Sequence, residues 1–216
     1  MSIMSDLVAE ARATGWATGT ATLLAVQSSI ARHGWTIRPN RASGPNVDML
    51  VPVKQESARA RSLSALFGMG AQPLHTDGAH HRVPPDIVVL AASARSAVTT
   101  SLWKFPRGGV PAQVRNDLRH GLFVVSTAGK SFLAPAFEDG RLRYDPGCMS
   151  PADERARRVR AFFAETRESA VEHHWDTPDL VLVINNRAVV HARDDASSEP
   201  GRTIHRLALT IPREIR

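Results

Sequence analysis

The chain has 216 residues, a formal net charge of +6 at pH 7 and one cysteine, Cys148. This length suits one domain with a sizeable core, so we expect a single domain over residues 1–216. A lone cysteine excludes an internal disulfide, and the longest apolar runs are far too short to cross a membrane. The N-terminus lacks a basic stretch followed by an apolar one, so we expect no signal peptide, no membrane association and a cytoplasmic protein.

The positive charge alone is compatible with binding to nucleic acid or to an anionic substrate. The arginines, however, are scattered along the chain. The run from Arg155 to Arg160 falls on an expected amphipathic helix, where a solvated helix face is the simpler interpretation. The sequence contains no zinc-finger spacing, helix-turn-helix signal or aromatic RNA-binding pattern. We therefore expect no nucleic-acid partner, while a homo-oligomer is left open.

The first half of the chain is predicted to begin with a short helical extension and to continue with irregular segments. Ser5 is a candidate N-cap for the first helix, and the continuous apolar run before residue 93 favours a buried strand. In chain order we expect a helix over 6–14, an apolar segment over 21–26, an irregular stretch to about 46, a strand over 49–53, helix or coil over 57–66, a loop over 78–85 and a strand over 86–92.

The second half is predicted to be a series of short strands interrupted by one long helix. Asp139-Gly140 is a hairpin signal, and Pro151 is placed as the first residue of the helix. We expect strands over 121–126, 131–137 and 141–144, a helix over 151–173, two β runs around an Asn-Asn turn within 180–191, and a last strand over 202–211. This pattern indicates a mainly β protein with a few helices and a double-stranded β-helix, or jelly-roll, core over about 49–211.

His75-Thr76-Asp77 and the distant His191 are the candidate metal ligands. On an extended strand His75 and Asp77 point to the same face. Two imidazoles and one carboxylate can occupy one face of an octahedral ferrous ion and leave positions open for a cosubstrate and dioxygen. The alternative is a surface histidine beside a turn-forming aspartate before Gly78, together with a core histidine at 191.

The ordered set His75, Asp77, His191 and Arg202 resembles the Fe(II)/2-oxoglutarate-dependent dioxygenases of the TauD/TfdA family, which includes taurine dioxygenase and clavaminate synthase-like enzymes. Their pattern is His-x-Asp/Glu, a long gap, a second His and then an Arg. The resemblance covers roughly residues 63–211. It implies a jelly-roll enzyme that uses iron, 2-oxoglutarate and dioxygen, releases succinate and CO2, and hydroxylates an unactivated C–H bond.

The resemblance also implies roles for individual residues. Arg202 would grip the distal carboxylate of 2-oxoglutarate through a bidentate pair. Thr100 would add a hydroxyl, with Thr99 as the alternative, because the glycines that mark this segment in the family are missing here. Arg206 is expected to share a strand face with Arg202 and to hold an anionic group of the substrate. The alternative for Arg206 is a brace for the cosubstrate.

His80 and His81 follow the metal-site strand, where the family's substrate enters, and are candidates for substrate contact; the alternative is a pair of exposed loop histidines. The carboxylate of Asp77 fills the position that chloride occupies in related halogenases, so halogenation is disfavoured. The expected substrate is a small polar or anionic molecule. An oxygenase acting on a macromolecule and a catalytically silent jelly-roll binding protein are the alternatives.

Overall fold

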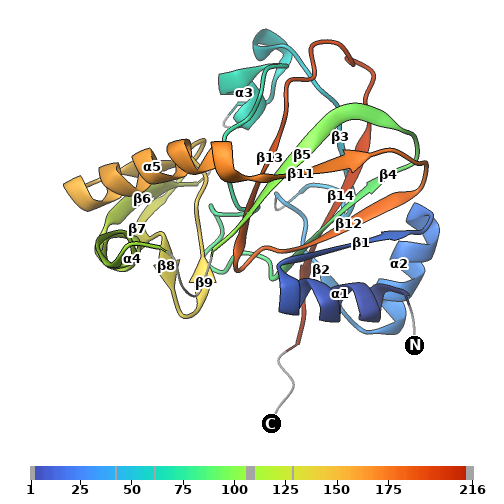
Figure 1. Cartoon of the computed structure of the whole chain (residues 1–216), viewed down its shortest axis with the longest axis horizontal. Coiled ribbons are helices and arrows are strands. Elements are labelled where there is room, and N and C mark those ends of the chain that lie inside the picture. Colours follow the sequence, from blue (N-terminus) through green and yellow to red (C-terminus); the bar gives the residue numbers. More distant parts are fainter. Residues whose placement is uncertain (1–2, 42, 61, 106–109, 128, 213–216) are drawn as a thin grey trace.

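Two antiparallel β-sheets face each other at the centre of the structure, a computed structural model that describes residues 3–41, 43–60, 62–105, 110–127 and 129–212 (Figure 1). The larger sheet has the strand order β1-β12-β4-β14-β2, and β3 also pairs with β14. Its strands are β1 (Trp16–Thr20), β2 (Thr36–Ile37), β3 (Asp48–Leu50), β4 (Ile87–Ala92), β12 (Leu180–Asn185) and β14 (Ile204–Thr210).

The smaller sheet has the order β11-β5-β13. Its strands are β5 (Ser96–Lys104), β11 (Val171–Trp175) and β13 (Val189–Arg193). On the other edge of β13, His75 forms an isolated antiparallel bridge with His191. We call the two facing sheets, with their connecting loops, the barrel. Their arrangement is the jelly roll that the sequence predicts.

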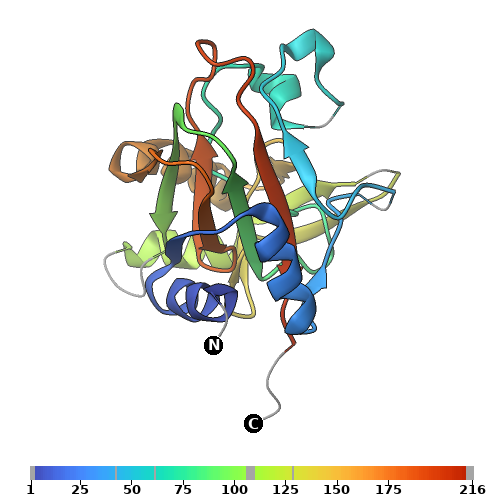
Figure 2. The same ribbon diagram turned by 90° about the vertical axis from the view of Figure 1, so that its right-hand side faces the viewer.

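Alternating residues explain why both faces of the larger sheet are buried. One set points between the sheets and forms the inner core: Val88, Leu90, Ala92, Leu102, Trp175, Leu182, Ile184, Val189 and Ile204. The other set packs against helices α1 (Ile3–Thr14) and α2 (Leu23–Arg32), which lie on the outer face (Figure 2). All six residues of β4 are therefore buried, which accounts for its continuous apolar sequence.

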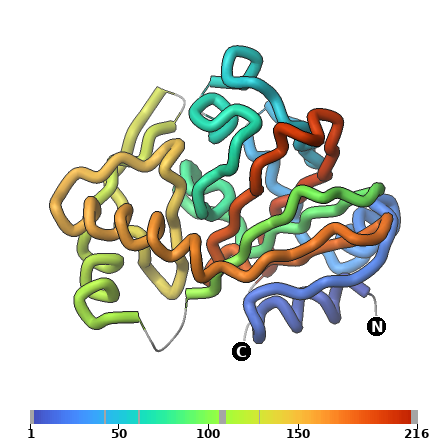
Figure 3. Tube along the Cα trace, turned by 45° about the horizontal axis from the view of Figure 1, so that its top comes forward, coloured from blue at the N-terminus to red at the C-terminus, as the bar shows by residue number. Residues whose placement is uncertain are grey.

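A smaller α/β unit lies beside the barrel and is inserted between β5 and β11 (Figure 3). It contains a three-stranded sheet of order β10-β6-β7 and a small hairpin of β8 and β9, covered by two helices. The elements of this inserted unit are α4 (Ala112–His120), β6 (Leu122–Ser126), β7 (Ser131–Pro135), β8 (Phe137–Glu138), β9 (Arg141–Leu142), β10 (Met149–Pro151) and α5 (Glu154–Thr166). Short helices η1 (Gln55–Ser57), α3 (Leu63–Phe67) and η2 (Arg167–Ser169) complete the described elements.

The hairpin turn at Asp139-Gly140 is confirmed, since both residues have positive φ angles of 51° and 70°. The long helix predicted over 151–173 is wrong at both ends. Pro151 belongs to β10, and Asp153 caps α5 by accepting the Ala156 N–H at 2.8 Å. The helix ends at Thr166, and His173 lies on β11 because that segment pairs with β5.

Three further expectations differ from the structure. Ser5 lies inside α1 and does not cap it, and the stretch expected to be irregular before residue 46 contains most of α2. Strands β1 and β5 and helix α4 were not predicted, because their polar and small residues give weak local signals. None of the described helices is both long and apolar enough to cross a membrane.

Candidate active site

His75, Asp77 and His191 come together in the barrel, with one ligand atom from each lying within 4.8 Å of the others. All three side chains are buried. The backbone enforces this arrangement, because the His75 N–H donates to the His191 carbonyl at 2.9 Å and the His191 N–H donates back at 2.8 Å. The two segments that the sequence singled out are therefore joined directly.

The local conformation at His75 differs from the extended strand that was predicted. Only His75 makes a ladder contact, and Asp77 begins a turn. The side chain of Thr76 is directed to Tyr144, where its hydroxyl accepts the Tyr144 N–H at 3.0 Å. Thr76 thus ties the metal-site segment to the inserted unit, while its two neighbours meet at the triad.

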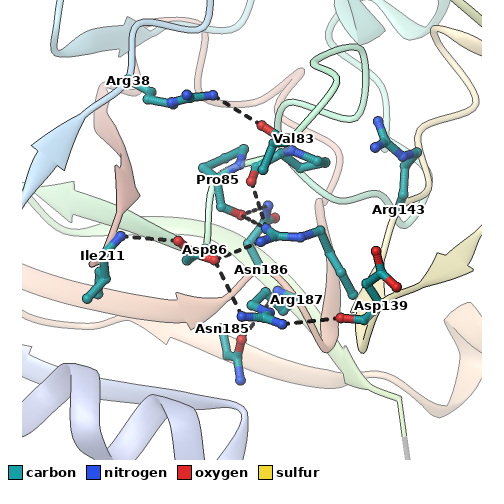
Figure 4. A network of polar contacts seen from close by, with 12 residues as sticks. Arg38, Val83, Pro85, Asp86, Asp139, Arg143, Asn185, Asn186, Arg187 and Ile211 are labelled. Carbon is teal, nitrogen blue, oxygen red and sulfur yellow. Dashed lines mark hydrogen bonds and ion pairs between the residues drawn. The ribbon is translucent and has the colours of Figure 1, made fainter. Parts of the chain in front are cut away.

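Asn186 holds the backbone of the loop over residues 77–85 at both ends. Its Oδ1 accepts the Asp77 N–H at 2.9 Å, and its Nδ2 donates to the carbonyls of Asp77 at 3.0 Å and Pro85 at 2.9 Å. Asn186 is buried in the turn between β12 and β13, and its position beside Pro85 is shown in Figure 4. The sequence marked this residue as part of a turn and of the Asn186-Arg187 stretch that resembles the oxygenase family.

Asp86 anchors the far end of the same loop (Figure 4). Its Oδ1 accepts Nη2 of Arg141 at 2.9 Å and lies 3.7 Å from Nη1 of Arg187, while its Oδ2 accepts the Ile211 N–H at 3.1 Å. Strand β14 and the inserted hairpin are thereby connected to the loop that begins at Asp77. The metal-site loop is braced on two sides before any ligand binds.

The two carboxylate oxygens of Asp77 have different surroundings. Oδ1 accepts Nη1 of Arg206 at 2.5 Å, whereas Oδ2 is buried with no hydrogen-bond partner and lies 3.6 Å from Nε2 of His191. Burial by itself would raise the pKa of Asp77. Attraction to Arg206, together with its hydrogen bond, outweighs burial, so that the pKa is lowered and the carboxylate is ionised at neutral pH.

The imidazoles are oriented so that each can offer a ring nitrogen to a metal. Nδ1 of His75 lies 3.0 Å from the Pro73 carbonyl, which can only accept, so Nδ1 is the donor in this bond and Nε2 is the nitrogen left to bind a metal. Burial, together with the neighbouring His75, lowers the pKa of His191 to about 3. Two imidazoles and an ionised carboxylate with a partnerless oxygen fit a divalent transition metal such as ferrous iron.

Arg202 lies two residues before β14, so the prediction that it shares one strand with Arg206 is wrong. Its Nε donates to the Ser96 hydroxyl at 3.0 Å, and its guanidinium lies 6.0 Å from the Trp175 ring centroid. It borders an open depression of about 400 Å³ that Ser96 and Glu199 also line. Glu199 accepts the Ser96 hydroxyl at 2.7 Å. Burial and repulsion from Arg193 lower the pKa of Arg202 to about 10, so it is charged at neutral pH.

The two candidate threonines point to opposite faces of β5. The Thr100 hydroxyl accepts Nε1 of Trp175 at 3.1 Å on the inner face. The Thr99 hydroxyl lies 3.5 Å from Oδ2 of Asp194 on the other face. Trp175 therefore links Thr100 to Arg202, and the three side chains form one cluster.

Register along β5 relates this cluster to the triad of His75, Asp77 and His191. His191 pairs with Leu102, and Arg193 pairs with Thr100. The guanidinium of Arg202 reaches the Val98 carbonyl at 3.4 Å. Because a strand rises about 3.3 Å per residue, the metal end and the arginine end of this row are separated by roughly 13 Å. Thr100 lies between the two ends.

His80 and His81 lie on the braced loop beyond Asp77. Nε2 of His80 lies 2.9 Å from the Asn40 carbonyl, and the two imidazole rings are 4.2 Å apart. Burial, with the neighbouring His80, lowers the pKa of His81 to about 4. Arg143 fixes this loop by donating to the backbone carbonyls of Ala79, His81 and Arg82 at 2.5, 2.6 and 2.8 Å.

Sequence reasoning did not identify several residues that shape the site. Asp48 pairs with Arg206, Asn186 holds Asp77, and Trp175 bonds to Thr100. None of them carries a local signal, since each acts on a residue far away in the chain. The one sequence signal for a role of Trp175 in the site is that it is the sole tryptophan between the long helix and the last strands.

No family model and no curated protein matches this sequence. Solved structures do match. An asparagine oxygenase in complex with Fe(II), 3-hydroxyasparagine and succinate superposes with a TM-score of 0.74 at 18% identity, covering 94% of this chain and 77% of that one. The non-heme iron oxygenase OrfP in complex with Fe and alpha-ketoglutaric acid gives 0.70 at 19% identity, covering 96% and 78%. OrfP with Fe, succinate and (3S)-hydroxy-L-Arg gives 0.69 at 17%, covering 96% and 80%.

At these identities the likeness shows the fold of the chain. The predicted mainly β architecture with a jelly-roll core is confirmed, and it is the architecture of non-heme iron oxygenases.

Proposed function

We propose that this chain is an Fe(II)- and 2-oxoglutarate-dependent oxygenase of the TauD/TfdA type, with residues 1–216 as one catalytic domain. The observation that carries the proposal is the buried triad of His75, Asp77 and His191, in which an ionised carboxylate oxygen faces two imidazoles and has no hydrogen-bond partner among the described residues. A buried charge of this kind is costly unless a ligand satisfies it. The fold of the iron oxygenases named above supports the same assignment.

Ferrous iron, when bound with 2-oxoglutarate, supplies the activation of dioxygen that C–H hydroxylation requires. The protein's own contribution is to hold three ligands, to bind the far end of the cosubstrate and to exclude water. Arg202 would bind the distal carboxylate through its guanidinium, and Thr100 would add a hydroxyl from the same face. The order His191, Thr100, Arg202 along β5 suits an elongated dicarboxylate that is held at both ends.

The substrate is proposed to be a small polar molecule of the amino-acid class. The solved structures contain 3-hydroxyasparagine and (3S)-hydroxy-L-Arg, which are hydroxylated amino acids. His80 and His81 are proposed to contact it, because they lie on the loop that continues from Asp77. Asp77 retains a carboxylate at the position where a halogenase needs a vacancy, so hydroxylation is the expected outcome. A reducing compartment such as the cytoplasm suits a ferrous enzyme.

The direct test is anaerobic titration with Fe(II) and 2-oxoglutarate, followed by screening of free amino acids for succinate release. We expect one iron per chain, a visible charge-transfer band, and an oxygen atom from labelled dioxygen in the product. The variants His75→Ala and His191→Ala should lose both the iron and the band. Retention of wild-type iron content by both variants would show that the triad is not the metal site.

Arg202 is expected to set the affinity for 2-oxoglutarate. Truncating a charge-assisted pair costs about 2–5 kcal/mol, so Arg202→Ala should raise the Kd of 2-oxoglutarate roughly thirtyfold or more. Thr99→Ala is the matched control, because the Thr99 hydroxyl points to the opposite face of β5. If Arg202→Ala and Thr99→Ala raised the Kd of 2-oxoglutarate equally, the cosubstrate would bind at a place other than Arg202.

A further inference from the structure

Arg206 is placed by strand register at the centre of two ion pairs. It pairs with Leu90 of β4 on one side and with Asp48 of β3 on the other. It shares the inner row of β14 with Ile204, which belongs to the core between the sheets. Its side chain is largely buried, at 14% exposure. A buried guanidinium needs charged partners to offset its desolvation.

Both terminal nitrogens of Arg206 have such partners. Nη1 donates to Oδ1 of Asp77 at 2.5 Å, and Nη2 donates to Oδ2 of Asp48 at 2.8 Å. Directly opposite residues of unlike charge on neighbouring strands stabilise an antiparallel pair, so Asp48 holds the guanidinium in place from β3. An anionic group of a substrate would have to displace one of these two carboxylates.

We infer that Arg206 is a positioning residue for the metal carboxylate and that Asp48 fixes it in that role. Arg206 occupies Oδ1 of Asp77 and thereby directs Oδ2, the oxygen without a protein partner, toward His191. The carboxylate would then bind the metal through Oδ2 alone. The inference rests on the proposed function in one respect only, namely that the triad binds a metal.

This arrangement has a consequence for the substrate. Because Asp48 neutralises Arg206 on the side away from the triad, Arg206 does not serve as the receptor for an acidic substrate group. The loop with His80 and His81 then remains as the candidate for substrate contact. Removing Asp48 should therefore weaken the metal site instead of improving the binding of anions.

The experiment uses the full chain and Co(II) as the probe, in the absence of 2-oxoglutarate. Calorimetry gives the Kd of Co(II), and the visible spectrum at saturation reports the ligand set. Arg206→Lys is the primary variant, because Arg206→Met would leave two buried carboxylates unpaired and destabilise the fold. Asp48→Asn is the second variant. Arg157→Gln is the matched control, since it removes an exposed ion pair with Glu154 on α5. Thermal unfolding of the metal-free proteins checks that each variant is folded.

We expect Arg206→Lys to raise the Kd of Co(II) by about 10–100-fold, as is typical when a residue that orients a metal ligand is lost. The spectrum at saturation should also change, because Oδ1 is released. Asp48→Asn should raise the Kd in the same direction by a smaller factor, without tighter binding of succinate. The control should match the wild type in both readouts.

Three outcomes count against the inference in different ways. If the wild type binds no Co(II), the proposed function fails and the inference fails with it. If the wild type binds Co(II) and the folded Arg206→Lys protein has the same Kd and spectrum, the inference alone is wrong. If Asp48→Asn keeps the wild-type Kd of Co(II) and binds succinate more tightly, Arg206 is an anion receptor that Asp48 masks.

Discussion

Asp117 in the inserted unit and Asp77 in the metal-site loop of the barrel are both buried carboxylates that bind an arginine. They differ in how many of their oxygens have a hydrogen-bond partner. Both oxygens of Asp117 accept hydrogen bonds at 2.8 Å from Arg158, and Gln113 adds a third bond at 3.0 Å. Asp77 gives one oxygen to Arg206 and leaves the other without a partner. The first carboxylate is complete in the folded chain, and the second is not.

The same difference extends to the two regions as a whole. Among the residues that the structure describes, the buried side-chain atoms without a partner belong to Asp77, His173, His191 and Arg193, all in the barrel and its metal-site loop. The buried polar residues of the inserted unit are bonded: Asp117 to Arg158, Arg143 to three carbonyls and Thr166 to the Phe162 carbonyl. Native proteins rarely leave such atoms unpaired without a reason. The described polar groups of the inserted unit are thus satisfied within the chain, whereas the barrel contains buried polar atoms that are not.

The largest expected effect tests whether the two regions can be separated. Phe163 is fully buried in the inserted unit and stacks on Tyr144 with ring centroids 4.3 Å apart. Phe163→Ala should lower the free energy of unfolding by about 3–5 kcal/mol, as measured by denaturant titration. The Kd of Co(II) in the folded variant should stay at the wild-type value. A parallel loss of metal affinity would show that the two regions act as one.

A metal should stabilise the barrel and depend on the unpaired oxygen. At a free Co(II) concentration of about 100 times its Kd, linkage adds about 2.7 kcal/mol to the free energy of unfolding. This gain should vanish in Asp77→Ala and persist in Asp117→Asn, which alters the completed carboxylate instead. Thermal unfolding with and without Co(II) measures both. An equal gain in Asp77→Ala would place the metal outside the triad.

Thr76 offers a way to perturb the contact between the regions. Thr76→Val keeps the shape of the side chain but removes the acceptor for the Tyr144 N–H. Leaving a buried donor unsatisfied costs about 1–3 kcal/mol, so the free energy of unfolding should fall by that amount. We also expect a modest rise in the Kd of Co(II), because Thr76 lies between two of the ligands. An unchanged unfolding curve would mean that the contact contributes nothing.

The smallest effect concerns Asp117 and its dependence on pH. Asp117→Asn should reduce the free energy of unfolding at pH 7 by about 0.5–1.5 kcal/mol, the typical net value of one hydrogen bond. The hydrogen bond from Arg158 lowers the pKa of Asp117 below its usual value near 3.8. A depressed folded-state pKa contributes stability above the unfolded value that is lost as pH falls through the folded value. The difference between wild type and variant should therefore begin to shrink as the pH falls below about 4, and it should be lost only below the folded-state pKa of Asp117. A difference that stays constant as the pH falls until this carboxyl is protonated would contradict this origin.

Local patterns in the sequence were sufficient for several parts of this protein. The continuous apolar run of β4, the Asp139-Gly140 turn and the first helix follow from residue types within a few positions, because side-chain period and turn chemistry are local properties. The pattern His75-x-Asp77 with the distant His191 likewise named three residues that the structure brings together.

Other features were decided only by the tertiary structure. The small and polar residues of β5 form a strand because β11 and β13 pair with it on both sides. The predicted long helix ends early because the residues that follow it pair with β5 as strand β11. Arg206 bonds to Asp77 and Asp48, which lie 129 and 158 positions away in the chain. Asn186 reaches the backbone of Asp77 across 109 positions. Contacts of such length leave no periodic or compositional trace, since they depend on which strands become neighbours when the two sheets close around the core.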